Sequence, residues 1–279
     1  APWYRTYTAY ASYLILFIIG INLFGKYQAK VSVEKAENER RLNELKDAKK
    51  MQEGMLPKVF PTSEHFEISA GLITSTEVGG DYYDFFKTDD IIYAVCGDAT
   101  GHGTSAGMVV SVTKSALNGL PFSSTSDVLE KINNIIKKIK LGSLRMSLNI
   151  CKIEKNLMTM SSAAMPPIYH YLSKSKKCDE IEIQGLPLGG LKNETYDSIT
   201  RKIAINDVFV LLSDGLPEAE NKNKELYDYE RVRKLIAKNG KKSAEEIKDV
   251  MLKEVDLWLD GQLPDDDVTI VVIKRNNKK

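Results

Sequence analysis

An uncharged stretch near the N-terminus divides this chain into parts that cannot fold in the same surroundings. Residues 6–25 carry no formal charge, lie between Arg5 and Lys26, and are most apolar from Leu14 to Ile19. Twenty helical residues extend about 30 Å, the thickness of the hydrocarbon layer of a bilayer. Aromatic residues gather at the N-terminal end of the stretch, where their rings favour the membrane interface. We therefore expect residues 6–25 to form a single membrane span.

Two alternatives to this span are a signal peptide and a buried helix of a soluble protein. No small-x-small cleavage site follows the apolar run. Two lysines, Lys26 and Lys30, follow the span, whereas only Arg5 precedes it. This slight positive excess on the C-terminal side predicts that the rest of the chain lies in the cytoplasm, attached to the inner (cytoplasmic) membrane. Because the chain begins with Ala1 instead of Met, we also expect a longer upstream part.

A charged segment follows the span. No Gly or Pro occurs from Lys30 to Glu53, and the pairs Glu37/Arg41 and Arg40/Glu44 have the four-residue spacing of facing helical side chains. The pattern predicts a solvated helix, and its patchy apolar stripe leaves two readings open: a coiled-coil homodimer linker, or a lone connecting helix. The domain division predicted is a membrane segment at 1–29, a helical signalling linker at 30–56 and a folded domain at 57–279.

The remaining sequence alternates short runs rich in β-branched and aromatic residues with turn signals. The predicted helical segments follow one another in groups along the sequence and do not alternate with single strands. This order favours an α+β domain of antiparallel sheets over a βαβ fold. Strands are predicted at 66–73, 82–87, 91–96, 145–153, 157–162, 168–172, 181–184, 208–212 and 268–274. Helices are predicted at 105–117, 126–140, 229–238 and 244–259.

Bulk composition excludes several classes of function. Thirty-nine basic and 38 acidic residues give a net charge of +1, so no global field attracts nucleic acid, and any charge-based function must be local. The three cysteines lack metal-ligand spacing, and we expect reduced, buried thiols.

Acidic residues stand at the ends of the predicted strands. Asp81 lies in Val78-Gly-Gly-Asp-Tyr-Tyr-Asp84, Asp98 in Gly97-Asp-Ala-Thr-Gly-His-Gly103, and Asp214 in Ser213-Asp-Gly215, while Asp265-Asp-Asp267 precedes the last strand. Such carboxylates, if they converge, repel one another unless cations lie between them. Oxygen-only ligands suit two Mg²⁺ or Mn²⁺ ions, which could hold and activate a water for phosphomonoester hydrolysis. Plain surface turns remain the alternative reading of each cluster.

The order of these motifs closely resembles the SpoIIE/RsbU branch of the PPM, or type 2C-like, protein serine/threonine phosphatases. The resemblance covers about Met51 to Lys274 and rests on Met55-Leu-Pro57, the clusters of Asp81 and Asp98, Ser213-Asp-Gly-Leu-Pro-Glu-Ala219 and Asp266-Asp-Val-Thr-Ile-Val-Val272. It implies an α-β-β-α sandwich with a dinuclear Mn²⁺/Mg²⁺ site that hydrolyses phosphoserine or phosphothreonine.

The resemblance also implies roles for individual residues. Asp81 and Asp98 would hold the metal-bound water, the carbonyl of Ala99 would join them, and Asp214 and Asp266 would complete the second metal's shell. Asp84 and Asp267 are second choices. His102 could donate a proton to the leaving oxygen, although a loop histidine between glycines is as often merely polar and exposed.

Family members commonly act on phosphorylated anti-sigma-factor antagonists and answer to a sensor through a helical linker. Residues 1–10 also resemble the exit from a periplasmic sensor region. A non-catalytic partner-switch module on the same fold is the alternative function, although every acidic position expected for the metal site is still occupied by Asp. One departure is Ser161-Ser-Ala-Ala-Met-Pro-Pro167, where many relatives carry an Asn-Ala-Gly-His-type segment. It leaves the metal ligands unchanged and bears on substrate docking and the shape near the site.

Two other readings are disfavoured. Gly101-His-Gly-Thr-Ser-Ala-Gly107 imitates a dinucleotide loop but has one residue too many between its second and third glycines. Val78-Gly-Gly-Asp-Tyr82 continues with Tyr-Asp, unlike the Gly-Gly signature of diguanylate cyclases.

Overall fold

The protein is described here by a computed structural model that covers residues 2–75, 78–121 and 123–276. It separates into two compact units, residues 1–47 and residues 48–279. A short 3₁₀ helix at Trp3–Arg5 precedes the helix α1, Tyr7–Met55, which continues without a break from the apolar stretch through the charged segment. Its apolar window has a mean hydropathy of 1.7 and is long enough to cross a membrane, a test that a signal sequence near an N-terminus also passes.

Two five-stranded antiparallel sheets form the larger unit. One has the order β1-β10-β9-β6-β7 and the other β2-β3-β4-β5-β8. The first sheet contains β1 (Phe66–Ile73), β6 (Ile168–Leu172), β7 (Lys177–Ile181), β9 (Val208–Leu212) and β10 (Val268–Arg275). The second contains β2 (Asp81–Thr88), β3 (Ile91–Ala99), β4 (Met146–Glu154), β5 (Leu157–Ala163) and β8 (Ile199–Lys202).

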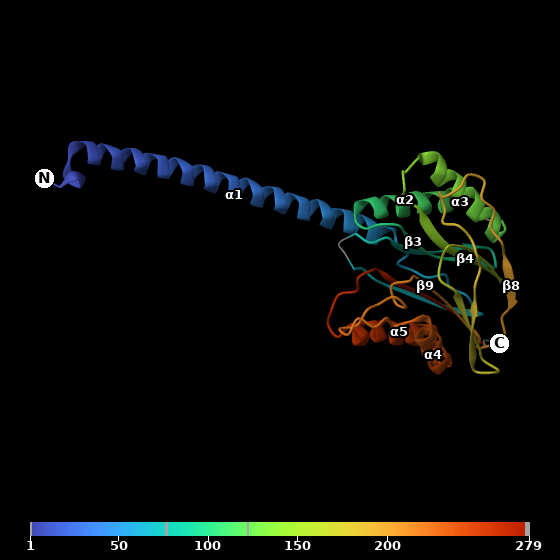
Figure 1. Ribbon diagram of the computed structural model, residues 1–279. Coiled ribbons are helices and arrows are strands. Elements are labelled where there is room, and N and C mark those ends of the chain that lie inside the picture. The colour runs from blue at the N-terminus through green and yellow to red at the C-terminus, as the bar shows by residue number, and fades with distance from the viewer. Residues whose placement is uncertain (1, 76–77, 122, 277–279) are drawn as a thin grey trace. The chain divides into compact units, whose positions relative to one another are not determined.

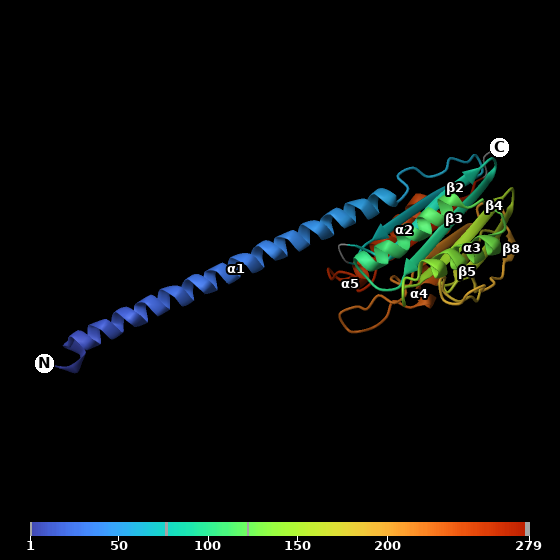
Figure 2. The same cartoon turned by 90° about the horizontal axis from the view of Figure 1, so that it is seen from above.

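A pair of helices covers the outer face of each sheet. Figures 1 and 2 show α2 (Thr104–Gly119) and α3 (Thr125–Ile139) over the sheet that contains β2, β3, β4, β5 and β8. The helices α4 (Tyr229–Asn239) and α5 (Ala244–Leu259) lie on the other sheet, as Figure 1 shows. The predicted α+β class and α-β-β-α sandwich of antiparallel sheets are therefore confirmed.

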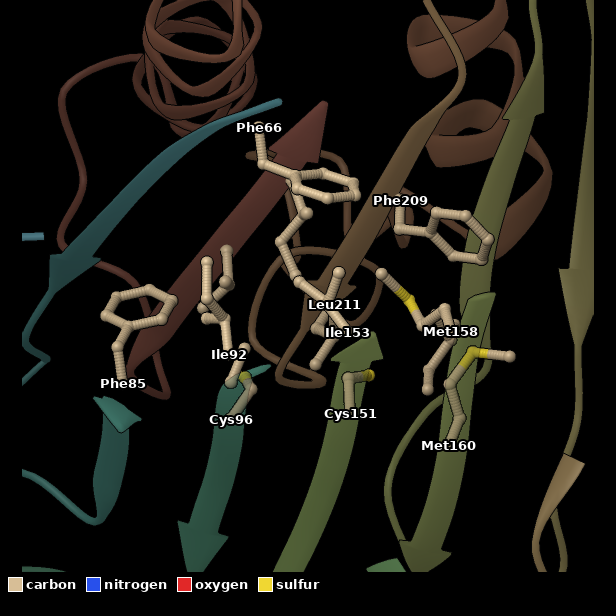
Figure 3. Close-up of a cluster of buried hydrophobic side chains, with 14 of the residues drawn as sticks. Phe66, Phe85, Ile92, Cys96, Cys151, Ile153, Met158, Met160, Phe209 and Leu211 are labelled. Atoms are coloured by element: carbon tan, nitrogen blue, oxygen red, sulfur yellow. The ribbon is translucent and has the colours of Figure 1, made fainter. Parts of the chain in front are cut away.

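Three apolar clusters fill the spaces between these layers. The cluster between the two sheets includes Phe85, Cys96 and Cys151 from one sheet and Phe209 and Leu211 from the other, as Figure 3 shows. Two further clusters lie under α2 and α3 and under α4 and α5. All three cysteines are free and buried, in agreement with their expected role as small apolar residues.

Local sequence signals set the helix boundaries. Ser124 caps α3 by accepting a hydrogen bond from the backbone N–H of Asp127. Ser243 and Glu246 form a reciprocal capping box at the start of α5, which satisfies backbone donors that have no partner within the helix. Lys140 ends α3 in a left-handed conformation with φ 60°, and the chain turns there toward β4.

One edge strand lies outside its predicted range, and another was not predicted. The strand expected at 181–184 is formed by Lys177–Ile181, and Ile199–Lys202 was not predicted as a strand. Both lie at the edges of their sheets. Edge strands are short and polar because one side faces water, so the apolar alternation that reveals a central strand is weak in them.

Candidate active site

The acidic clusters come together from both sheets at one end of the sandwich. Asp81 begins β2, Asp98 stands next to the end of β3, and the two residues are direct partners across the antiparallel pair. Asp214 follows β9 and Asp266 precedes β10, and these strands are neighbours in the other sheet. Each carboxylate is thus placed by the end of a strand whose interior residues are buried in the core.

Ser213 joins the two sheets at this end. Its hydroxyl donates to Oδ2 of Asp81 over 2.7 Å and accepts from the backbone N–H of Thr269 over 2.9 Å. All three residues are buried. The hydrogen bond fixes the orientation of the Asp81 carboxylate against the strand that leads out of the Asp266 turn.

Asp267 supports the loop before Asp81 with both carboxylate oxygens. Its Oδ2 accepts from the backbone N–H of Gly80 over 2.7 Å, and its Oδ1 accepts from the N–H and hydroxyl of Ser75 over 2.7 and 3.0 Å. The side chain is 2% exposed. Its lone pairs are therefore committed to the loop, which is a different task from that of Asp266 beside it.

The glycines in these turns permit close approach of the backbone. A Cβ on Gly80 would lie 2.7 Å from the carbonyl oxygen of Ala99 and 3.0 Å from Oδ1 of Asp98. A Cβ on Gly215 would lie 2.0 Å from the carbonyl oxygen of Asp267. A side chain at either position would displace the group that it meets, so the glycines keep the carboxylate turns together.

The protonation of the cluster reflects burial and crowding. Burial, followed by the charges of Asp214 and Asp266, raises the pKa of Asp98 to about 8. Burial and then the charge of Asp98 raise the pKa of Asp81 well above its usual range. The pKa of Asp214 rises through burial and then the charge of Asp266. Like charges gathered with little water favour their neutral forms unless a cation compensates them.

Donor chemistry at this end of the sandwich fits a hard divalent cation. Oδ1 of Asp214 is buried and has no hydrogen-bond partner, which is costly for an acceptor unless it receives a ligand. As the described side chains lie, no three His, Cys, Asp or Glu groups are arranged to share one ion. The ligand set Asp81, Asp98, Ala99, Asp214 and Asp266 therefore stays a prediction for the metal-loaded protein.

Asp84 belongs to another network. Its Oδ2 accepts from the Tyr82 hydroxyl over 2.7 Å and pairs with Nζ of Lys114 in α2 at 2.5 Å, while Oδ1 accepts from the N–H of Phe85. Tyr82 packs in the cluster under α2 and α3. The structure thus places Asp84 toward the helical layer, where it anchors α2, and does not bring it to the carboxylates at the sheet ends.

His102 stays at the edge of the cluster. It is exposed on the turn between β3 and α2. Burial raises the pKa of Asp266, and the charge of the nearby His102 offsets a small part of this rise.

Gln52, near the end of α1, contacts the acidic loop and was not identified from the sequence. Its Nε2 donates to the carbonyl oxygen of Gly79 over 2.6 Å, and its Oε1 accepts from the Gly79 N–H over 2.9 Å. The side chain is 6% exposed. Gly79 lies two residues before Asp81, so the helix holds the loop that carries this carboxylate. A glutamine within a charged helix gives no spacing signal that could have revealed this contact.

The segment that departs from the expected family pattern is tied into the fold. The hydroxyls of Ser161 and Thr125 lie 2.7 Å apart, which links β5 to α3, and Ser162 accepts from the N–H of Met165 over 3.3 Å. Ala164 has φ 58°, a conformation that alanine adopts only at a cost. These serines therefore serve internal contacts.

Comparison with known proteins gives one family and several similar folds. The model of the family described as Stage II sporulation protein E (SpoIIE) matches residues 88–276. The chain is 28% identical over 271 residues to the phosphoserine phosphatase RsbU of Bacillus subtilis, covering 94% of this chain and 78% of that protein. It is 21% identical to the stage II sporulation protein E of the same organism, covering 77% of this chain and 26% of that one.

Solved structures show the same architecture. The SiaA-PP2C domain of Pseudomonas aeruginosa aligns with a TM-score of 0.74 at 17% identity, covering 86% of this chain and 98% of that domain. RsbX in complex with magnesium aligns with a TM-score of 0.59 at 17% identity, covering 77% of this chain and 98% of that protein. At these identities the likeness shows a shared fold, that of the type 2C phosphatases.

Proposed function

The chain belongs to the SpoIIE family of protein phosphatases, and on this premise we propose that it hydrolyses phosphoserine or phosphothreonine in a regulatory protein with divalent metal. The observation that carries the proposal is the gathering of Asp81, Asp98 and Asp214 at one end of the sandwich, with an acceptor oxygen of Asp214 left unpartnered. Buried carboxylates with raised pKa values are typical of catalytic or metal-binding sites.

Two ions, Mn²⁺ or Mg²⁺, would be held by Asp81, Asp98, the carbonyl of Ala99, Asp214 and Asp266. When bound, such ions lower the pKa of a water and neutralise charge that develops on the phosphoryl oxygens. RsbX was solved with magnesium, which agrees with this choice of hard cation.

The remaining side chains position this set. Ser213 holds the Asp81 carboxylate through its hydroxyl, and Asp267 holds the loop that presents Asp81 through Gly80. His102, exposed and near Asp266, would donate a proton to the seryl oxygen as it leaves. In this proposal, one set of residues binds the ions, a second set orients the first, and His102 is the candidate proton donor.

Control of the site would reach it through the linker. Gln52 belongs to α1 and forms hydrogen bonds with both the N–H and the carbonyl oxygen of Gly79. A shift of the end of α1 would therefore move the loop that carries Asp81. We propose that a sensor upstream of residues 6–25 acts through this helix and that residues 30–56 pair in a homodimer. The phosphatase domain would then lie in the cytoplasm, anchored to the inner membrane by a single span.

The proposed substrate is a phosphorylated anti-sigma-factor antagonist. This choice is supported by the similarity to RsbU, which is named a phosphoserine phosphatase. We expect a compact phosphoprotein to be a better substrate than a small aryl phosphate, because remote contacts supply binding free energy that positions the phosphoryl group.

The test is a phosphatase assay on the full chain in detergent micelles. Release of phosphate from a phosphoserine protein and from p-nitrophenyl phosphate should require Mn²⁺ or Mg²⁺ and should stop when EDTA is added. Activity that survives both EDTA and Asp98→Asn would exclude this function. Divalent binding without any turnover would instead support a partner-switch module that signals by binding.

A further inference from the structure

A small hollow lies at the end of α3, next to the residue that pairs with Thr100 on the Asp98 turn. It has a volume of about 240 Å³ and lies where α3 ends and β4 begins. Lys137, Lys140 and Arg145 line it together with the apolar side chains of Leu141 and Leu144. We call these three cationic residues the basic rim.

The local sequence concentrates positive charge at this place. From Lys131 to Ile153 the chain contains no Asp or Glu, although its net charge is only +1. Lys137 lies in the last turn of α3, where the partial negative charge of the helix C-terminus is enough to explain the presence of a cation. Arg145 lies beyond the helix, directly before β4, so the helix dipole does not account for its position.

Arg145 is held in place without an acidic partner. Its Nη1 donates to the carbonyl oxygens of Gly142 and Leu144 over 2.8 and 2.7 Å. Across the described part of the chain, no carboxylate forms an ion pair with Lys140 or Arg145, although Asp98 lies on the adjoining turn. The other guanidinium nitrogens of Arg145 are therefore available to an incoming carboxylate.

Backbone hydrogen bonds join the rim to the catalytic turn. The N–H of Thr100 donates to the carbonyl oxygen of Arg145 over 3.0 Å, and the N–H of Arg145 donates to the hydroxyl of Thr100 over 2.9 Å. Thr100 lies two residues after Asp98, and Ala99 pairs with Met146. The backbone of Arg145 therefore lies about one strand spacing, ~4.8 Å, to the side of the turn that carries Asp98, and Lys137 and Lys140 lie beyond it at the end of α3.

We propose that the basic rim binds acidic side chains that flank the phosphorylated residue of the protein substrate. The proposal rests on the proposed phosphatase function and assigns a sequence preference to it. Guanidinium groups bind carboxylates through paired hydrogen bonds, which gives both affinity and direction. An extended peptide advances ~3.3 Å per residue, so the preferred acidic residues would lie about two to four positions from the phosphoserine.

Two synthetic phosphoserine peptides of equal length test this preference. One carries Asp and Glu around the phosphoserine, and the other carries Asn and Gln at the same positions. With the full chain in micelles and Mn²⁺, we expect kcat/KM to favour the acidic peptide by about 10-fold or more, mainly through KM, and the preference to weaken as salt rises.

Substitutions then locate the preference. Lys140→Ala/Arg145→Ala should bring the two peptides to equal kcat/KM while leaving turnover of p-nitrophenyl phosphate unchanged. Lys140→Ala alone removes only an exposed side chain and should lower the preference without a change in melting temperature. The matched control is Lys238→Ala/Lys241→Ala, which removes two exposed cations near the end of α4 on the opposite outer layer.

The results separate the two levels of the proposal. Wild-type turnover with equal kcat/KM for both peptides would overturn the basic rim and leave the phosphatase function standing. A preference that persists in the double variant, or that the control variant also loses, would overturn it as well. Failure of the wild type to hydrolyse either peptide or p-nitrophenyl phosphate with Mn²⁺ present would overturn the phosphatase function itself.

Discussion

Gln52 binds the backbone of Gly79 through both of its side-chain polar groups, with its amide donating over 2.6 Å and its carbonyl accepting over 2.9 Å. This pair is buried and joins two segments 27 residues apart. Because Asp81 follows Gly79 by two residues, the contact couples the end of α1 to the position of a carboxylate.

Replacement of Gln52 by Leu should therefore weaken metal binding more than folding. The leucine fills a similar volume but leaves the N–H and carbonyl of Gly79 without partners, so the loop before Asp81 loosens. Outer contacts of metal ligands typically contribute about 10- to 100-fold in metal affinity or activity. Titration of phosphatase activity with Mn²⁺ should show a half-saturating concentration raised by a factor in that range.

Gln52→Glu provides the matched comparison for this contact. The glutamate keeps an acceptor for the Gly79 N–H but loses the donor to the Gly79 carbonyl, so its effect should be similar in direction to that of leucine. An Mn²⁺ titration curve for both variants that coincides with the wild-type curve would contradict the coupling.

Asp98→Asn should reduce activity strongly while it stabilises the metal-free fold. The amide keeps the shape of the side chain but removes the charge that a hard cation requires, so we expect kcat to fall by more than about 100-fold. Isothermal titration with Mn²⁺ should show the loss of binding directly. Retained Mn²⁺ affinity in this variant would place the ions elsewhere.

The stability of the metal-free protein should depend on pH through the same carboxyl group. The pKa of Asp98 is raised from 3.8 to about 8, so the folded state binds more protons than the unfolded state between these values. The free energy of unfolding therefore falls as pH rises from about 4 to about 8.

Melting temperatures measured in EDTA across this pH range test the dependence. Asp98→Asn should flatten the decrease and raise the melting temperature at pH 8 by at least about 2 °C, since 1 kcal/mol corresponds to ~2–4 °C in a domain of this size. Mn²⁺ should remove most of the decrease in the wild type. An equal slope in the variant and the wild type would assign the titration to other groups.

Lys114→Met should destabilise the domain by leaving Asp84 buried without its cation. Breaking a fully buried pair costs about 3–5 kcal/mol, and a smaller loss of about 2–3 kcal/mol is expected because the Lys114 side chain is 25% exposed. The double variant Asp84→Asn/Lys114→Met should recover part of this lost stability, as measured by chemical denaturation. If the double variant loses more free energy of unfolding than the two single variants lose together, the unpaired charge is not the cause.

Central strands and the carboxylate positions could be predicted from sequence because their signals are local. β1 at Phe66–Ile73 and α5 at Ala244–Leu259 were predicted with their observed bounds, since each combines clear periodicity with end signals. Asp81 and Asp98 stand at strand ends next to glycines, a pattern visible in the printed chain. The order of the motifs, which resembles that of the phosphatase family, then indicated the layered sandwich.

Contacts between distant segments could not be predicted in this way. Nothing in the local sequence distinguishes Asp267, whose oxygens hold the loop of Gly80, from its neighbour Asp266, because the difference arises only when β10 lies beside that loop. The same holds for Asp84, which pairs with Lys114, a residue 30 positions away on α2. Side-chain direction on a folded sheet decides these roles.

Both sheets contribute to the acidic end of the sandwich, with Asp81 and Asp98 on one and Asp214 and Asp266 flanking strands of the other. Neither sheet in isolation carries the whole set, so its geometry exists only after the two faces have closed on their shared core. A chain in which only one sheet has formed would hold at most half of the proposed metal ligands. If these carboxylates hold the ions, hydrolysis should begin only after both sheets have closed.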